Sequence, residues 1–443
     1  MVSMRSKLPT PALANLAIAV LLLALAVLGL KILNRISTHP ELTSTSLQAF
    51  LLSYCLLLFY SARMKQPYQF YAVVLPGLES LAVQELTSLS AHNIQAGQGG
   101  VRFAGTLDTL YRVSLRARCM TRIQVRVGKC HAMMLAELQH HVANMAWERF
   151  LPKGCKVVVQ ASAEKSKLMH TDKIAEHVLA GIKDALGKRL DKEDGREQQV
   201  YVHINNNRCD IRVDASGERL DRRGYRLASA KAPMRETLAA AVVQWMDWKS
   251  DEALLVPMCG SGTLAIEAAL MGRKMAPNIQ HDFPFKDWDI FKEKAWLRVL
   301  EKTSAMAQDA LANKIDVSDI HVGALTACKE NAERAGVLAD LHVQQQDVQK
   351  LKPAKDAKAG LMICNPPYGL RIEMDGIQFY RELGHVLRDS FVGWRVAVMC
   401  PDWKHEKALS LPVRRRLRVK HGGLWLDVLD VSSNDVWSKG EVP

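Results

Sequence analysis

The sequence predicts an α/β protein, with a parallel sheet in its C-terminal half and an α+β region ahead of it. Beyond Arg226, helical segments alternate with short apolar strands and glycine turns, which is the rhythm of parallel β–α units. Residues 64–225 instead mix short strands and helices in no regular alternation. A length of 443 residues fits about two or three domains. We therefore expect one folded region over 64–225 and a second over 226–443.

Composition excludes a disordered chain and indicates an acidic partner. Hydrophobic residues make up 48% and charged residues 24%, which provides enough apolar side chains for a packed core. Lys and Arg number 59 against 46 for Asp and Glu, and the net charge of +13 favours nucleic acid or an anionic membrane surface. The nine cysteines include no CxxC pair and are odd in number, which argues against a zinc ribbon or a disulfide framework. Reduced thiols and a cytoplasmic working part are expected.

Residues 1–63 form a hydrophobic N-terminal extension. The uncharged run 12–30 is just long enough to cross a bilayer as a helix, whereas the run 47–60 is short for a span. Residues 12–60 would then associate with the membrane and tether the protein to its inner face. Met64, however, begins a stretch typical of the start of a soluble domain, so 1–63 could also come from a misassigned start codon. The sequence leaves both interpretations open.

The region 64–225 opens with a strand at 68–75, which is rich in aromatic and β-branched residues and is closed by a Pro-Gly turn. Apolar residues at helical spacing predict a helix over 78–89. By the same two patterns we expect strands at 101–103, 122–127, 156–161, 200–205 and 209–214, and helices at 108–118, 135–148 and 172–186. This mixture of short elements predicts a small α+β region.

A glycine turn follows the apolar strand 253–256 and precedes a helix. The turn reads Pro-Met-Cys-Gly-Ser-Gly-Thr over 257–263. Glycine lets a ligand approach the backbone, and the first N–H groups of the helix face that ligand. The pattern is neither a Walker A motif nor GxGxxG. By itself it indicates either a ligand-binding turn or a simple tight turn.

A second motif, Asn-Pro-Pro-Tyr over 365–368, follows the apolar run 360–364. Its two prolines fix an extended, rigid loop at the C-terminal end of a strand, where open α/β sheets bind ligands. The Asn365 amide oxygen and the Pro366 carbonyl can both accept hydrogen bonds from one amine, and the Tyr368 ring offers a face to a planar group. The motif therefore suits an exocyclic amine on a planar base.

Two acids lie between these motifs. Asp319 precedes a helix, and Asp347 follows a stretch that alternates like a strand. An acid at the end of the second strand can bind ribose hydroxyls, and an acid after the third can accept from an adenine amino group. Each acid alone is typical of a solvated turn. The ordered series of glycine turn, acid, acid and Asn-Pro-Pro-Tyr is far more specific.

In that order, the motifs PMCGSGT, SDIH, QQQD and NPPYG resemble those of class I S-adenosylmethionine-dependent methyltransferases that act on amino groups. The segments LDRRGYR at 220–226 and APMRETLAA at 232–240 are similar to a narrower family, the THUMP-domain RNA methyltransferases, nearest the bacterial 23S rRNA guanine-N2 methyltransferases. The resemblance runs from about residue 65 to the C-terminus. It implies a Rossmann-like methyltransferase domain over 226–443 and a THUMP and ferredoxin-like RNA-binding region over 64–225.

The resemblance also implies roles for individual residues. Those that line the methionine part of S-adenosylmethionine would be Pro257, Cys259, Gly260, Ser261, Gly262 and Thr263. Asp319 would bind the ribose and Asp347 the adenine. The residues of the catalytic loop, which hold the target amine and stack on its base, would be Asn365, Pro366, Pro367 and Tyr368.

One departure from the family pattern bears on the cofactor. The family usually has Asp before the proline of the glycine motif, where this chain has Val256. An acid there would help to hold the ammonium group of the cofactor, so its loss predicts weaker binding or, at the extreme, a degraded enzyme. His321, where the family often has a second acid, is a milder departure.

The resemblance implies direct methyl transfer to the exocyclic N2 amine of a guanine in 23S rRNA, with no metal and, since the chain ends at Pro443, with a single activity. The alternatives are a tRNA substrate, a protein glutamine as the substrate, and an RNA-binding protein whose cofactor site is spoiled. RNA would bind chiefly to 64–225. The basic residues that cluster in the sequence are Arg112, Arg116, Arg118, Arg122, Arg126 and Lys129, then Arg222, Arg223 and Arg226, then the run 414–420. The last run is equally typical of a solvated strand edge.

Overall fold

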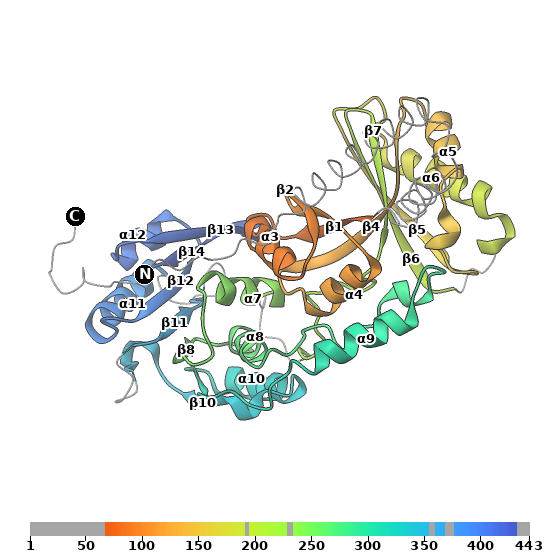
Figure 1. Cartoon of the computed structure of the whole chain (residues 1–443). Helices are drawn as coiled ribbons and strands as arrows, with labels where there is room; N and C mark the ends of the chain where they lie inside the picture. The colour runs from red at the N-terminus through yellow and green to blue at the C-terminus, as the bar shows by residue number, and fades with distance from the viewer. Residues whose placement is uncertain (1–66, 191–194, 228–233, 354–358, 368–375, 432–443) are drawn as a thin grey trace, which may run out of the picture. The chain divides into compact units, whose positions relative to one another are not determined.

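The computed structural model describes residues 67–190, 195–227, 234–353, 359–367 and 376–431 (Figure 1). The chain divides into two units, 1–67 and 68–443, and all elements below belong to the second. The hydrophobic extension 1–63 and Tyr368 lie outside the described residues. Within the described ranges, no helix has both the length and the apolar character needed to cross a bilayer.

Seven strands form the first sheet, in the order β2-β3-β1-β4-β7-β6-β5. The strands are Tyr68–Val74 (β1), His92–Gly97 (β2), Gly100–Gly105 (β3), Met120–His131 (β4), Lys156–Glu164 (β5), Glu197–Asn205 (β6) and Arg208–Asp214 (β7). Neighbouring strands are antiparallel except β5 and β6, which run parallel. Because β4 pairs with β1 on one side and with β7 on the other, 68–131 and 156–214 share one continuous sheet.

Helices pack against the apolar face of this sheet. They are Glu79–Ser88 (α3), Leu107–Arg116 (α4), Leu135–Ala143 (α5) and Thr171–Leu186 (α6). The alternation in β1 explains the packing, because Phe70, Ala72 and Val74 are buried among the helices while the residues between them are not. The same hydrophobic cluster takes in Trp296 and the other aromatic side chains of 283–296. The segment after the glycine turn therefore packs partly against the first sheet.

The second sheet also has seven strands, in the order β10-β9-β8-β11-β12-β14-β13. They are Leu254–Pro257 (β8), Ile315–Asp319 (β9), Leu341–Gln345 (β10), Leu361–Cys364 (β11), Arg395–Cys400 (β12), Arg415–His421 (β13) and Leu424–Asp430 (β14). β8 to β12 are parallel, and β13 and β14 add antiparallel strands at one edge. The chain order reverses between β8 and β11, at the switch point where open α/β sheets bind ligands. The predicted Rossmann-like fold is confirmed.

Helices cover both faces of the second sheet. They are Glu236–Trp245 (α7), Thr263–Gly272 (α8), Val322–Arg334 (α10), Gly376–Ser390 (α11) and Trp403–Leu409 (α12). The helix Glu293–Ser304 (α9) instead packs on the cluster of the first sheet through Trp296 and Val299. Leu254 and Val256 share a hydrophobic cluster with α7, α8 and α10, whereas Leu255 shares one with α11 and α12. Successive strand residues point to opposite faces, so these two helix groups lie on opposite sides of the sheet. Short 3-10 turns occur at Trp147–Arg149 (η1), Gly187–Leu190 (η2), Pro284–Asp287 (η3), Leu338–Asp340 (η4) and Val348–Lys350 (η5).

Three elements differ from the expectation. The strand expected at 122–127 is longer, because β4 continues to His131 through its pairing with β7. The helix expected over 135–148 ends at Ala143 and is followed by η1. No apolar alternation predicts a strand at His92–Gly97, whose side chains are almost all exposed, yet β2 forms there by pairing with β3 at the sheet edge.

Candidate cofactor and substrate site

The loop between β8 and α8 adopts backbone angles that favour glycine. Met258, Gly260 and Gly262 have φ values of 52°, 53° and 83°. A Cβ atom on Gly262 would lie 2.4 Å from Sγ of Cys328, so glycine at this position lets α10 pack close to the loop. A Cβ atom on Gly260 would meet no described atom within 4 Å. The backbone at Gly260 therefore leaves room for a ligand.

Asp319, at the end of β9, holds this loop in place. Its Oδ2 accepts a hydrogen bond from the backbone N–H of Gly260 at 3.0 Å, and its Oδ1 accepts one from the backbone N–H of His321 at 3.0 Å. The N–H of Cys259 donates to the Ser318 carbonyl at 3.0 Å. Each carboxylate oxygen can accept more than one hydrogen bond, so Asp319 keeps acceptor capacity for a ligand hydroxyl.

α8 begins directly after the loop, and its N-terminus is uncapped. Gly262 is the N-cap residue, and among the described residues no side chain accepts from the first turn, which also contains no acid. The first N–H groups of the helix, from Thr263 onward, are therefore available to an anionic group of a ligand. The carbonyl of Ser261 accepts from Nδ2 of Asn331 in α10 at 3.0 Å, which fixes the loop from its other side.

Asp347 follows the neighbouring strand β10. Its side chain caps η5 by accepting from the backbone N–H of Gln349 at 3.0 Å. The N–H of Gln346 donates to the Asp319 carbonyl at 3.1 Å, so the two strand ends are tied together. The structure thus brings both predicted acids and the glycine loop to the same edge of the sheet.

Asn365, Pro366 and Pro367 follow β11 at that edge. The parallel register pairs Met362 with Leu255, which carries Asn365 level with the glycine loop. Oδ1 of Asn365 is buried and accepts no hydrogen bond from any described residue. An unpaired buried acceptor costs about 1–3 kcal/mol, so this oxygen is suited to a donor that a ligand supplies.

Two thiols near these motifs are poor nucleophiles. A hydrogen bond with Cys328, together with burial, raises the pKa of the Cys259 thiol. Burial likewise raises the pKa of Cys364, the last residue of β11. Only the thiolate attacks an electrophile efficiently, so neither cysteine is poised to form a covalent intermediate.

Val256, the departure from the family pattern, belongs to the hydrophobic core. Its side chain is 1% exposed and lies in the cluster formed with α7, α8 and α10. The parallel register places it beside Val317 of β9. A carboxylate at this position would need a partner to offset its desolvation, whereas valine needs none.

Glu267, a buried acid at the centre of an ion-pair network, was not predicted as a functional residue. Its side chain lies 3.4 Å from Nε of Arg223 and 3.9 Å from Nη1 of Arg118, and it accepts from the Tyr225 hydroxyl at 3.1 Å. Burial raises the pKa of Tyr225 and lowers that of Arg118. The available signal was a lone acid in the otherwise apolar helix TLAIEAALMG. The network joins α8, behind the glycine loop, to the segment that leaves the first sheet.

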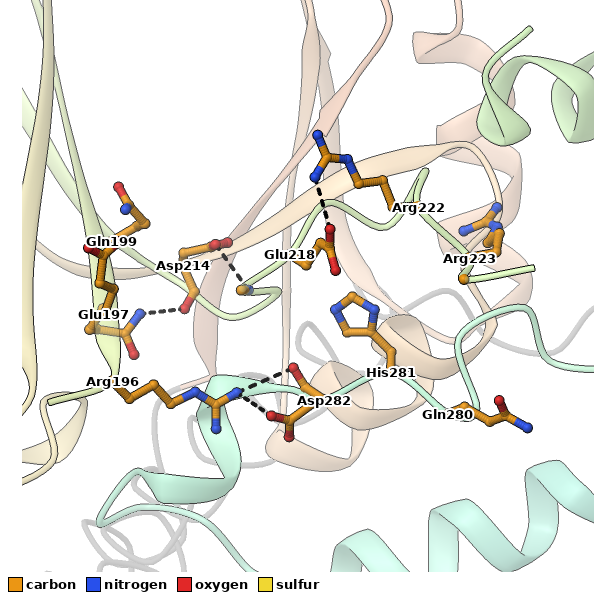
Figure 2. Close-up of a pocket in the computed structure, with 13 residues that line it drawn as sticks. Arg196, Glu197, Gln199, Asp214, Glu218, Arg222, Arg223, Gln280, His281 and Asp282 are labelled. Atoms are coloured by element: carbon orange, nitrogen blue, oxygen red, sulfur yellow. Dashed lines mark hydrogen bonds and ion pairs between the residues drawn. The ribbon is translucent and has the colours of Figure 1, made fainter. Parts of the chain in front are cut away.

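Most arginines that cluster in the sequence are engaged by carboxylates within the protein. We call six of them the paired arginines. They are Arg122 with Asp214 (2.6 Å), Arg126 with Asp210 (2.6 Å), Arg222 with Glu218 (2.9 Å), Arg226 with Glu236 (2.9 Å), Arg415 with Asp430 (2.8 Å) and Arg416 with Asp427 (2.7 Å). Figure 2 shows one of these pairs, Arg222 with Glu218, beside a cavity of about 560 Å³. These side chains offer less charge to RNA than the sequence suggests.

Comparison with protein families divides the chain into three parts. Residues 223–427 match the family described as "RMKL-like, methyltransferase domain". Residues 69–124 match the "RlmL ferredoxin-like domain", and 134–214 match the THUMP domain. The family resemblance in the sequence is confirmed.

Curated relatives have related names. The chain is 31% identical over 363 residues to a putative RNA methyltransferase of Synechocystis, across 80% of this chain and 94% of that protein. It is 33% identical over 362 residues to the ribosomal RNA large subunit methyltransferase K/L of Methylococcus capsulatus, across 78% of this chain and 48% of that protein. The chain therefore spans about half the length of the K/L relative.

Solved structures agree with this grouping. SMU.472, a putative methyltransferase complexed with SAH, superposes with a TM-score of 0.76 at 27% identity, over 84% of this chain and all of that one. A possible methylase from Clostridium difficile superposes with a TM-score of 0.77 at 29% identity, over 83% of this chain and 98% of that one. With its ferredoxin-like, THUMP and methyltransferase parts in this order, the chain belongs to the THUMP-containing RNA methyltransferases.

Proposed function

We propose that this protein is an S-adenosylmethionine-dependent RNA methyltransferase that methylates the exocyclic N2 amine of a guanine in 23S rRNA. The observation that carries the proposal is the buried Oδ1 of Asn365, which has no hydrogen-bond partner among the described residues and lies level with the glycine loop. An acceptor kept for a ligand beside a cofactor loop suits an amino group that is to be methylated. The names of the K/L relatives support large-subunit rRNA as the substrate, and such a substrate places the working part of the chain in the cytoplasm.

The glycine loop and the two acids would hold the cofactor. The segment from Pro257 to Thr263 would surround the methionine part, where the uncapped α8 and the space at Gly260 fit a carboxylate and its carbon chain. Asp319 would accept from the ribose hydroxyls and Asp347 from the adenine amino group. When bound, S-adenosylmethionine supplies a sulfonium methyl group that a nucleophile can displace. Val256 leaves the ammonium group of the cofactor without one carboxylate partner, and this predicts weaker binding rather than none.

The catalytic loop would position the amine. Asn365 Oδ1 and the Pro366 carbonyl would each accept one amine hydrogen, which aims the nitrogen lone pair at the methyl carbon. Pro367 would keep the loop rigid, and Tyr368 would stack on the base. Alignment of nucleophile, methyl carbon and leaving sulfur supplies most of the rate enhancement in such a displacement. The amine becomes acidic once it is methylated, so its proton can leave without a dedicated base.

A base inside a duplex must first leave its stack, at a cost of about a few kcal/mol. Stacking on Tyr368 would return about 1–3 kcal/mol of that cost. The THUMP and ferredoxin-like region would hold the surrounding RNA through its backbone and shape. The base is then selected by RNA shape together with the pocket around Asn365.

Nucleoside mass spectrometry of separated rRNA and tRNA tests this proposal, with cells that lack the gene complemented by the wild type or by Asn365→Ala. We expect N2-methylguanosine to disappear from 23S rRNA in the deletion strain and to return only with the wild type. Loss from tRNA alone would replace the substrate but keep the chemistry. Unchanged marks in both RNA fractions would overturn the proposal.

A further inference from the structure

A second candidate site lies between α11 and α12, on the face of the second sheet opposite α8. We call it the α11–α12 groove. It encloses a cavity of about 430 Å³. Among the described residues, the ionisable side chains that line it are all basic, namely Arg381, His385 and Arg388 from α11 with Lys404 and Lys407 from α12. The spacing explains the geometry, because residues three or four apart share one face of a helix.

These basic side chains have no acidic partner within the described part of the chain. Arg388 donates to the Ser410 carbonyl at 2.9 Å and contacts His385 at 3.4 Å, and Arg381 donates to Gln378. The other lining residues are Ile377, Ala408 and Ser410, so no carboxylate of the described residues lines the cavity. This is the opposite of the paired arginines.

The acids on the same helices are engaged elsewhere or face away. Glu382 accepts from Gln378 at 2.9 Å. Asp402 caps α12 and pairs with His405 at 2.8 Å. Glu406 pairs with Arg416 at 2.6 Å. Asp389 is exposed but does not line the cavity. Because neighbouring like charges repel one another, such a cluster is favourable only when an anion is drawn to it.

The place of α11 in the chain connects the groove to the Asn365 loop. α11 is the helix that follows β11 and the Asn365 loop in the chain, and it packs against β11 through their shared hydrophobic cluster. A strand that delivers its base to Asn365 must carry its flanking phosphates across a neighbouring surface. We propose that the α11–α12 groove binds the phosphate backbone of the substrate RNA next to the target nucleotide. This inference rests on the proposed function.

Binding at several phosphates has a measurable signature. Each lysine or arginine that neutralises a phosphate releases counterions, so removing it lowers the salt dependence of binding by about one unit of slope. Arg381, Lys404 and Lys407 are exposed and make no hydrogen bond that holds the two helices together. The triple substitution Arg381→Ala, Lys404→Ala and Lys407→Ala should therefore leave the fold intact.

The test measures the Kd of the full-length protein for an unmodified 23S rRNA transcript at several salt concentrations. We expect the triple variant to bind about tenfold or more weakly near 0.1 M salt, with a slope reduced by about 2 to 3. Its affinity for S-adenosylhomocysteine and its thermal unfolding midpoint should equal those of the wild type. The double variant Lys404→Ala, Lys407→Ala repeats the test should the triple variant unfold early.

The control removes two exposed lysines of α9, Lys294 and Lys302, which form no ion pair within the described residues. It lowers the net charge as much as the double variant does, and it should change RNA affinity much less. Equal RNA affinity in the groove variants and the wild type would show that the groove does not bind RNA, and it would leave the proposed function intact. Wild-type protein that neither binds nor methylates any RNA would overturn both. Loss of binding to anionic phosphatidylglycerol vesicles, with RNA binding unchanged, would also reject the RNA assignment.

Discussion

Two regions of the molecule carry positive charge in opposite ways. The paired arginines lie in runs that are obvious in the sequence, yet each meets a carboxylate, as Arg126 meets Asp210 on the adjacent strand β7. The α11–α12 groove draws its cations from two helices separated by β12, and its lining contains no carboxylate from the part of the chain that the structure describes. The density of basic residues along a chain therefore does not measure the charge that a ligand meets. What matters is whether the fold places an acid within reach.

The partner acids show what this pairing costs. Burial would raise the pKa of Asp210, but hydrogen bonds from Arg126 and Arg212 outweigh it and lower that pKa to about 2. Asp214 is buried more deeply, and its pKa rises to about 6 in spite of Arg122. Both acids lie on β7, so Arg122 and Arg126 tie β4 to β7 within the first sheet. In the groove, Arg381, Lys404 and Lys407 form no ion pair with any described residue.

The largest expected effect is on stability, and it extends the comparison to Arg118 and Arg223, which also meet a carboxylate inside the protein. Glu267→Gln would leave Arg118 and Arg223 buried without their counter-charge, and breaking such a buried pair costs about 3–5 kcal/mol. We expect the free energy of unfolding to fall by about that amount in a denaturant titration. Lys404→Ala in the groove should leave the unfolding midpoint unchanged. A similar loss in both variants would remove the structural contrast between the regions.

The next largest effect is expected on the methylation rate, and it distinguishes loss of catalysis from loss of RNA binding. In the proposed reaction, Asn365→Ala removes the acceptor that would orient the amine, so kcat should fall about 100-fold. Its Kd for RNA and the salt dependence of that Kd should remain those of the wild type, because Asn365 contacts no phosphate. The groove variants should show the reverse pattern. Single-turnover methylation with excess enzyme checks the rate, and an unaltered rate would exclude Asn365 from the reaction.

A pH dependence of stability is expected among the paired arginines and not in the α11–α12 groove. Burial raises the pKa of Glu236 from 4.5 to about 7, against the charge of Arg226. The folded state therefore holds this proton more tightly than the unfolded chain, and the stability it confers below pH 4.5 is lost as the pH rises to about 7. Glutamine cannot titrate. Between pH 4.5 and 7 the free energy of unfolding of Glu236→Gln should therefore change by about 1–3 kcal/mol less than that of the wild type. Parallel stability curves for variant and wild type would contradict the assignment.

Much of the site could be predicted from the sequence, because parallel strands deliver their C-terminal ends to one edge. The glycine turn, Asp319 and Asp347 are each ambiguous alone, but their order along the chain before Asn365 is specific, and the sheet then brings them to one edge. The continuous first sheet could not be predicted, since the pairing of β4 with β7 depends on register between distant segments. β2 was hidden for a different reason, because its polar residues carry no apolar alternation.

The α11–α12 groove could not be predicted from the sequence for a third reason. Its basic residues are spread over 381–407 with a whole strand between them, and only the packing of α11 on α12 brings them to one cavity. The acids among them, such as Glu382 and Glu406, hide the excess of positive charge when residues are counted along the chain. Helix periodicity and contacts with other residues keep Glu382 and Glu406 out of the cavity lining, and a count along the chain does not show this.

The smallest expected effect tests the paired region directly with RNA. Arg222 and Glu218 form an exposed pair with side chains 66% and 59% accessible, and removing both as Arg222→Gln, Glu218→Gln keeps the net charge unchanged. Exposed pairs contribute little to stability, so the fold should be unaffected. If the pair is already neutralised, RNA affinity should change less than about twofold, whereas Lys407→Gln in the groove should weaken it about threefold. A larger loss in the double variant than in Lys407→Gln would mean that Arg222 exchanges its internal carboxylate for a phosphate when RNA binds. The distinction between paired and free cations would then describe only the unbound protein.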